Sequence, residues 1–232
     1  MSCFVLIHGG WHGGWCWRDM TTILRSEGHT VYAPTLTGLA ERRHLIDAVE
    51  GPDTHVEDIV QLLLWEDLRD VILVGHSYGG TIITGVAGRC PERIARLVYL
   101  DAFVPTQSGI SAAAMHPERA AEVAKMTRPD GHTDPSAFER WVSPERIDWI
   151  KTMTTPQPGT CFDKGVTLTG REAEVPERQY ILCTSNGKSP FSQFWEQYRD
   201  DPRWACHQID SLHDAMIEHP RALAELLTSE SS

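Results

Sequence analysis

A serine stands between two glycines at the point where an apolar run ends. The run Val71–Val74 is followed by "GHSYG", residues 75–79, and then by small residues that favour a helix. A Gly-x-Ser-x-Gly turn between a buried strand and a helix lifts the serine hydroxyl above the sheet, where it can attack a carbonyl carbon. A glycine-rich turn with an incidental serine is the alternative. Because a strand and a helix flank the turn, the sequence favours Ser77 as a nucleophile.

A serine hydroxyl needs a base that takes its proton. The last apolar strand, Ala205–Ile209, is followed by a loop that contains His213. His207 lies within that strand, and His219 lies beside a proline at a predicted helix start. His76 is adjacent to the nucleophile, and the turn directs its side chain away from the serine hydroxyl. His213 is therefore the predicted general base.

The acid that would orient this histidine is harder to place. The commonest arrangement puts it shortly after the penultimate core strand, but Tyr180–Trp195 contains no carboxylate. Asp101 directly follows the apolar run Arg96–Leu100, at the edge of the sheet where active sites collect. There it could fix the tautomer of the histidine, although a turn-capping role is the alternative. Weaker candidates for the acid are Asp210, Asp214 and Glu196.

Two backbone N–H groups are candidates to hold an oxyanion. That of Tyr78 lies at the helix start after the serine, and that of Gly10 lies in the glycine-rich loop after the first strand. His8, beneath this loop, is expected to order it by hydrogen bonds rather than to take part in catalysis. The sequence leaves the role of His12 open.

Large apolar side chains lie near these loops and in the middle of the chain. Most are expected to be ordinary packing, and Trp11 is the best pocket candidate because it follows the oxyanion loop. We predict that Trp11, Phe103, Trp141 and Trp149 line a pocket for a small or medium, mainly apolar acyl or aryl group. The whole set is Trp11, Phe103, Met115, Met126, Phe138, Trp141, Trp149 and Met153.

These residues need a sheet whose strands end at one edge. Short apolar runs alternate with segments of helical period, which predicts an α/β fold with a mostly parallel, doubly wound sheet. The predicted strands are Phe4–His8, Thr30–Ala33, Val71–Gly75, Arg96–Leu100, Tyr180–Thr184 and Ala205–Ile209. The predicted helices are Trp15–Ser26, Thr54–Trp65, Tyr78–Arg89, Phe191–Arg199 and Pro220–Thr228. Thr54 and Glu57 have the spacing of a capping box.

The middle of the chain has a different character. Residues 104–177 are rich in proline and short helical pieces but contain no convincing core strand. We predict a core formed by residues 1–103 and 178–232, with residues 104–177 inserted as a lid, hereafter the cap segment.

Composition narrows the classes of partner and site. The 232 residues suffice for one domain with an insertion, and the net charge of −11 disfavours nucleic acids and membrane surfaces as partners. Six cysteines without a CxxC pair predict neither a metal site nor a redox motif. No stretch has the pattern expected of a secretory signal or a membrane span. These features predict a cytoplasmic protein with reduced thiols.

The motifs together resemble the α/β-hydrolase superfamily. They are "FVLIHGGWHGGWCW", "EGHTVYAPTLTG", "DVILVGHSYGG", "RLVYLDAFVP" and "LHDAM". More narrowly, they are similar to plant methylesterases and hydroxynitrile lyases and to bacterial esterase and carbamate-hydrolase relatives. The resemblance implies the α/β-hydrolase fold, Ser77 and His213 as nucleophile and base, and Gly10 and Tyr78 as the oxyanion hole. It also implies a lid after Val104 and makes a homodimer plausible.

Two positions separate the chemistries within this group. Hydroxynitrile lyases of this type carry a threonine two positions after the glycine-loop histidine and a lysine directly after the catalytic histidine. This chain has Gly10 and Asp214 there. Because an anion would oppose a developing cyanide, cyanohydrin cleavage is disfavoured.

The predicted reaction is attack of Ser77 on a carboxylic ester, or on a carbamate, with no metal or organic cofactor. His213 acts as general base, Asp101 orients it, and water releases the acyl-enzyme. A lyase, a cofactor-free oxygenase and a non-catalytic small-ligand receptor are the alternatives on the same fold.

Overall fold

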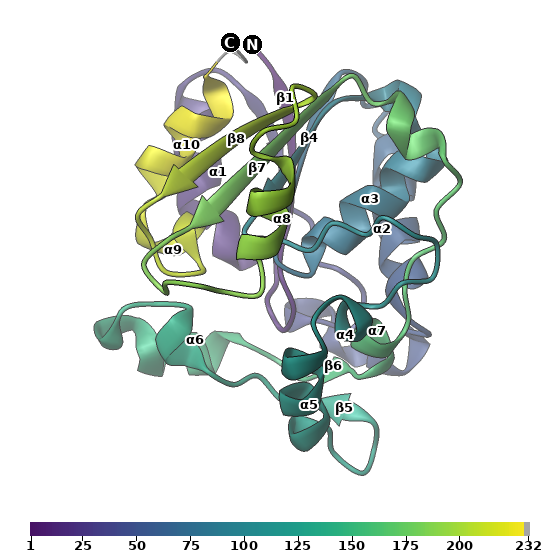
Figure 1. The fold of residues 1–232 in the computed structure, drawn as a ribbon, viewed down its shortest axis with the longest axis vertical. Helices are drawn as coiled ribbons and strands as arrows, with labels where there is room; N and C mark the ends of the chain where they lie inside the picture. The colour runs from purple at the N-terminus through teal and green to yellow at the C-terminus, as the bar shows by residue number, and fades with distance from the viewer. Residues whose placement is uncertain (230–232) are drawn as a thin grey trace.

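The computed structural model describes residues 1–229, apart from the side chains at 118, 119 and 122. Its main sheet has six parallel strands in the order β2-β1-β3-β4-β7-β8 (Figure 1). The strands are β1 Cys3–Ile7, β2 Thr30–Tyr32, β3 Val71–His76, β4 Ile94–Leu100, β7 Glu177–Cys183 and β8 Trp204–Ile209. All six predicted strands are confirmed, as is the mostly parallel α/β architecture. β3 is buried along its whole length, as a central parallel strand covered on both faces requires.

Helices cover both faces of this sheet. α1 packs with α9 and α10 on one face, and α2 and α3 lie together on the other (Figure 1). The α-helices are α1 Arg18–Ser26, α2 Pro52–Trp65, α3 Gly79–Arg89, α4 Ala112–Met115, α5 Pro117–Met126, α6 Ile147–Met153, α7 Thr160–Asp163, α8 Ser192–Tyr198, α9 Ala215–Glu218 and α10 Pro220–Thr228. The 3-10 helices are η1 Gly14–Trp17, η2 Ala40–Ala48, η3 Pro91–Arg93, η4 Phe138–Arg140, η5 Pro144–Arg146 and η6 Arg171–Glu174.

The predicted capping box of α2 is wrong. The helix begins at Pro52, not at Thr54, and its N-cap is Gly51. Proline suits the first helical position because its fixed φ is already helical and its missing N–H needs no partner. The hydroxyl of Thr54 instead accepts a hydrogen bond from the N–H of Glu50, at 3.3 Å.

The part of the cap segment from α4 to α7 lies beyond the carboxyl ends of the strands, whereas the part that contains η6 runs back along α3 to the start of β7 (Figure 1). It contains α4 to α7 and a two-stranded antiparallel sheet of β5 (His132–Thr133) and β6 (Gln157–Pro158), separate from the main sheet (Figure 1). The sequence does not predict this small sheet, because strands of two residues show no detectable periodicity.

The register of the central strands places two loops side by side. His76, the last residue of β3, pairs with Leu100, the last residue of β4. Ser77 and Asp101 therefore follow neighbouring strands at the same level of the sheet. The backbone reinforces this alignment, because Ser77 N–H donates to Leu100 O at 3.1 Å.

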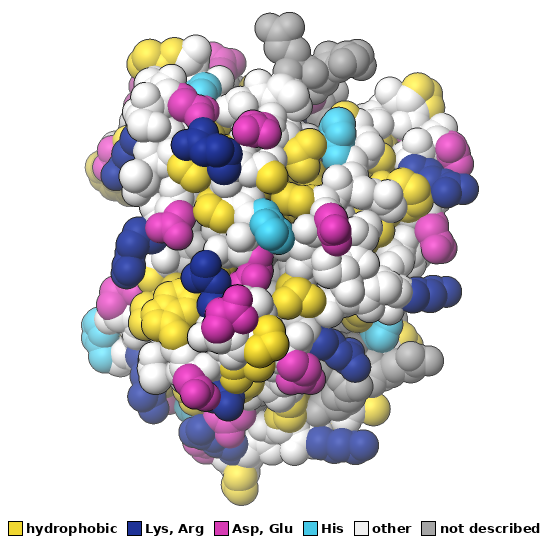
Figure 2. All heavy atoms as spheres, turned by 90° about the vertical axis from the view of Figure 1, so that its left-hand side faces the viewer, with side chains coloured by type: hydrophobic (Ala, Val, Ile, Leu, Met, Phe, Trp, Pro, Cys, Tyr) yellow, Lys and Arg dark blue, Asp and Glu magenta, His cyan; other side chains and the backbone are white. Residues whose placement is uncertain are grey.

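The surface charges are mixed on the face that carries α9 and α10. Figure 2, in which the left-hand side of Figure 1 faces the viewer, shows acidic and basic side chains interspersed with apolar ones. The net negative charge is thus spread rather than gathered there. Within residues 1–229, none of the helices combines the length and the apolar character that crossing a bilayer demands.

Candidate active site

Ser77 sits on a strained turn at the end of β3. Its φ is +53°, in the left-handed region that a non-glycine residue adopts only when its surroundings enforce it. The flanking glycines allow this turn. A Cβ on Gly75 would lie 2.5 Å from Gly79 O, and one on Gly79 would lie 2.7 Å from Ile7 O in the neighbouring strand β1. Both positions therefore require glycine.

The structure brings His213 and Asp101 together across 112 residues of chain. His213 Nδ1 donates to Asp101 Oδ2 at 2.5 Å, and Cys183 N–H donates to Asp101 Oδ1 at 3.2 Å. Burial raises the pKa of Asp101, and the bond from His213 opposes that rise. Asp101 also has a positive φ, +42°. The carboxylate predicted from the end of β4 thus lies in position to set the tautomer of His213.

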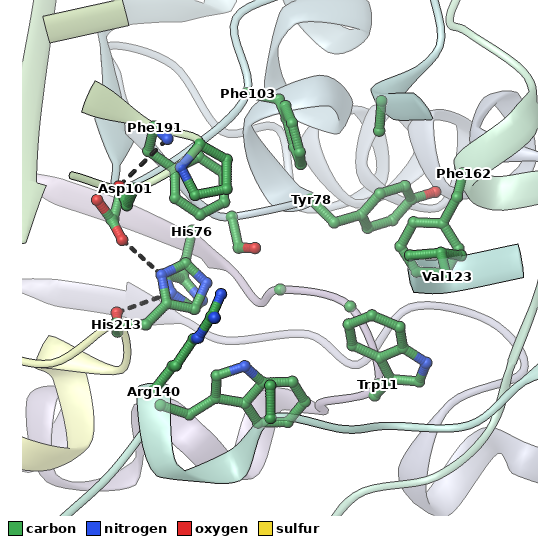
Figure 3. A pocket seen from close by; sticks show the side chains of 18 of the residues that line it. Trp11, His76, Tyr78, Asp101, Phe103, Val123, Arg140, Phe162, Phe191 and His213 are labelled. Carbon is green, nitrogen blue, oxygen red and sulfur yellow. Dashed lines mark hydrogen bonds and ion pairs between the residues drawn. The ribbon is translucent and has the colours of Figure 1, made fainter. Parts of the chain in front are cut away.

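Three further contacts hold His213 in place. His76 Nε2 donates to His213 O at 3.0 Å, and His213 N–H donates to Arg140 O at 3.1 Å. The Phe191 ring stacks on the imidazole, with centroids 4.9 Å apart and planes 4° from parallel (Figure 3). Burial, together with the neighbouring His213, lowers the pKa of His76 well below its usual range, so His76 serves as a neutral donor.

Ser77 and His213 line the same pocket. Within residues 1–229 the Ser77 hydroxyl makes no hydrogen bond, to His213 or to any other group. Bonds between a nucleophile and its base are often long until a substrate is bound, so this geometry is compatible with the predicted pair.

The candidate oxyanion donors also face this pocket. Gly10 and Tyr78 both line it, and their N–H groups donate to nothing in the part of the chain that the structure describes. Two free N–H groups beside a serine can hold the charge of a tetrahedral intermediate. The expectation that His8 orders the loop is confirmed, since its Nδ1 donates to Gly9 O at 2.8 Å and its Nε2 accepts from Leu36 N–H at 3.1 Å.

His12, whose role the sequence left open, forms a buried pair with Asp214. Its Nδ1 donates to Gly10 O at 2.7 Å, and its Nε2 lies 3.0 Å from Asp214 Oδ2. The side chains are 2% and 0% exposed. Because both ring nitrogens face acceptors, the pair must hold one proton more than a neutral imidazole beside a carboxylate. Burial lowers the pKa of His12, but the Asp214 carboxylate more than offsets it, so the net shift is upward.

This pair corrects the interpretation of Asp214. The carboxylate was expected to face a leaving group, but it points to His12 and is not among the residues that line the pocket. Its charge is therefore compensated within the protein. The position still offers no cation to a departing cyanide.

The pocket itself is small and largely aromatic. Its volume is about 150 Å³, and one wall is a row in which Trp11 stacks between Trp141 at 5.6 Å and Phe162 at 4.9 Å. Trp11 Nε1 donates to Thr133 O at 2.9 Å, which anchors this wall to β5. Trp11, Trp141 and Phe103 line the pocket as predicted.

The prediction for Trp149 is wrong. This side chain is 39% exposed and packs edge-on against Trp15, 5.4 Å away, outside the pocket. Helical periodicity in the cap segment cannot tell which face of α6 turns inward. Phe162, Phe191 and Arg140 were missed for the related reason that each lies on a short or irregular piece of chain, where no periodic signal marks the pocket.

One cluster of potential metal ligands occurs among residues 1–229. His76, His213 and Asp214 bring ligand atoms within 4.8 Å of one another. The ring of His213 is bonded to Asp101, and Asp214 is bonded to His12. These protein contacts occupy the groups, so we interpret the cluster as a hydrogen-bond network.

Comparison with known sequences agrees with this geometry. A family model described as "Alpha/beta hydrolase family" matches residues 4–226. The carbendazim hydrolyzing esterase of Nocardioides sp. (strain SG-4G) is 39% identical over 99% of each chain. Methylesterase 10 of Arabidopsis thaliana is 25% identical over 97% of this chain and 90% of its own.

A solved structure has the same architecture. An extracellular alpha/beta-hydrolase from a Paenibacillus species superposes with a TM-score of 0.84 at 24% identity, over 98% of each chain. At this level of identity the likeness shows a shared fold.

Proposed function

Because this chain belongs to the alpha/beta hydrolase family, we propose that it is a serine hydrolase that cleaves small, mainly apolar carboxylic esters or carbamates. The observation that carries this proposal is the bond between His213 and Asp101 at the wall of a pocket that also contains Ser77. The resemblance stated from the motifs is confirmed by the family match.

Each group has one role in the proposed mechanism. The Ser77 oxygen attacks the carbonyl carbon while His213 Nε2 takes its proton, and Asp101 stabilises the resulting imidazolium. The N–H groups of Gly10 and Tyr78 hold the oxyanion. The carbon–oxygen bond to the leaving alcohol then breaks, and His213 returns the proton to that alcohol. Water, activated by the same histidine, hydrolyses the acyl-serine to the acid and free serine.

Carbamates would follow the same course through a carbamoyl-serine. The names of the relatives support both substrates, since one hydrolyses carbendazim and others are called methylesterases. The apolar wall and the small volume of the pocket favour a compact acyl or aryl group in either case.

The test uses 4-nitrophenyl acetate and 4-nitrophenyl N-methylcarbamate, with release of nitrophenol followed over time. We expect a burst and turnover from the wild type, and mass spectrometry should find a fluorophosphonate label on Ser77. Ser77→Ala should lose both, whereas Ser26→Ala, at an exposed serine of α1, should keep both. The ratio of the two substrates' kcat/KM values distinguishes ester from carbamate preference. Turnover that survives in Ser77→Ala would exclude the proposed mechanism.

Three broader predictions belong to the same proposal. Residues 104–177 would act as the lid of the pocket. A cytoplasmic location with reduced thiols stays a prediction from the spacing of the six cysteines. A homodimer rests on resemblance alone, and light scattering of the purified protein would test it.

A further inference from the structure

The pocket has two chemically different ends. Arg140 lies beside His213, and Lys188 is also among the lining residues, whereas Phe162 and Val123 line the end opposite Arg140. Figure 3 shows Arg140 reaching from the cap segment toward the imidazole of His213, with Phe162 and Val123 across the pocket. A substrate that spans the site therefore meets the Arg140 cation at the His213 end and apolar side chains at the other.

The backbone of Arg140 is fixed relative to the proposed base. Its carbonyl oxygen accepts from His213 N–H at 3.1 Å and from Asn186 Nδ2 at 2.7 Å. These two bonds tie η4 to the loops that follow β7 and β8. The Arg140 backbone, which carries the guanidinium side chain, therefore cannot move away from His213 without breaking both bonds.

The two cationic groups lack acidic partners. Among the side chains that the structure describes, no carboxylate pairs with the Arg140 guanidinium or the Lys188 ammonium, although most of the other described arginines are paired. The pocket lining also contains Asp163, which is not part of the proposed triad. Asp163 directly follows Phe162 on α7 and so lies toward the apolar end. An anion would be attracted beside His213 and repelled beside Phe162.

We propose that the preferred substrates carry a carboxylate or a comparable anionic group on the leaving alcohol, and that Arg140 binds this group. This inference rests on the proposed hydrolase function. The leaving group is the half that lies beside His213, because His213 must hand it a proton. The planar guanidinium matches a carboxylate with two parallel hydrogen bonds, and Lys188 adds a second positive charge. The acyl half then occupies the aromatic end.

The test compares three acetate esters of nearly equal size whose leaving groups differ at one position. They are 3-acetoxybenzoate, 3-acetoxybenzamide and 3-methylphenyl acetate, which place a carboxylate, a neutral acceptor or a methyl group at the same site. Each kcat/KM is divided by the rate constant for hydrolysis by hydroxide, which corrects for leaving-group reactivity. The wild type should prefer the carboxylate, and 0.5 M NaCl should weaken that preference.

Substitutions of Arg140 test whether this residue causes the preference for the carboxylate ester. Arg140→Gln should lower the ratio of kcat/KM for 3-acetoxybenzoate to kcat/KM for 3-methylphenyl acetate about fivefold, as for an exposed charge pair. Arg140→Lys should fall between, because it keeps the charge without the planar fork. Arg43→Gln removes the same charge from an exposed position of η2 outside the pocket lining and should behave as the wild type.

Three results would overturn the inference. The wild type could show no preference for the carboxylate, Arg140→Gln could slow all three esters equally, or Lys188→Gln alone could abolish the preference. The hydrolase proposal is tested separately by Ser77→Ala, since it requires only that turnover of the neutral ester depends on that serine.

Discussion

Asp214→Ala is expected to lower the free energy of unfolding by about 2–3 kcal/mol, because it leaves the buried Nε2 of His12 without a hydrogen-bond partner. Asp214 is wholly buried and lies 3.0 Å from His12 Nε2, and the opposite nitrogen of that ring is committed to Gly10 O. A loss of this size is a large share of the roughly 5–15 kcal/mol that stabilises an ordinary domain.

Asp214→Asn is the matched control. Its side-chain N–H can donate to His12 Nε2, so a neutral imidazole keeps both hydrogen bonds and no buried charge is left alone. The cost should be nearer 1 kcal/mol, the net value of an ordinary hydrogen bond. His12→Ala should cost as much as Asp214→Ala, because it strands the carboxylate, and the double variant should cost less than the sum of the two.

The pH dependence of stability provides a second signature. The pKa of His12 is raised in the folded protein. The stabilisation that it contributes is therefore fully present below its unfolded pKa of about 6.5 and is lost as pH rises through the folded value. The wild type should lose stability relative to Asp214→Asn over that range, since the variant holds His12 neutral throughout.

Urea unfolding at several pH values between 6 and 9 measures these quantities. Fluorescence of the eight tryptophans and far-UV circular dichroism should report one transition. If Asp214→Ala and Asp214→Asn lost the same small amount, or if the wild type and Asp214→Asn had parallel pH profiles, the pair would not hold the extra proton, and the reasoning would be refuted.

Asp101→Asn should lower kcat about 10⁴-fold by favouring the wrong histidine tautomer, and a loss under tenfold in steady-state assays would place the acid elsewhere. Gly79→Ala should lower the free energy of unfolding by about 1–3 kcal/mol, because its Cβ would lie 2.7 Å from Ile7 O, and an unchanged urea midpoint would contradict that contact. Trp11→Ala should raise KM for short aryl esters, whereas Trp149→Ala should leave KM within twofold; equal effects would contradict the placement of Trp149 outside the pocket.

Sequence reasoning succeeded where a local pattern has a single structural solution. The apolar run before Ser77 forms a central strand because it is buried on both faces, and its glycines permit the turn that follows. The end of β4 placed Asp101 correctly at the edge of the sheet, because neighbouring parallel strands end at one level.

Sequence reasoning failed where the position of a side chain depends on contacts with residues far away in the chain. His12 and Asp214 are 202 residues apart, and nothing in either local sequence indicates that they pair. Trp149 shows the converse, since a large aromatic residue in a helical segment looked suited to the pocket yet packs at the surface. The cap segment depends most on such contacts, and its short helices offer the least periodic signal.

Asp101 lies directly after β4 and bonds His213, which has a consequence for the loop after β7. With Asp101 bound to His213, the loop after β7 carries no carboxylate for the proposed proton transfer. Its Asn186 binds the cap segment instead, through Arg140 O, and its Lys188 lines the pocket. A change at Lys188, by natural divergence or by design, can therefore alter which substrates are accepted, whereas Phe191 of the same loop stacks on His213 and supports the proposed proton transfer.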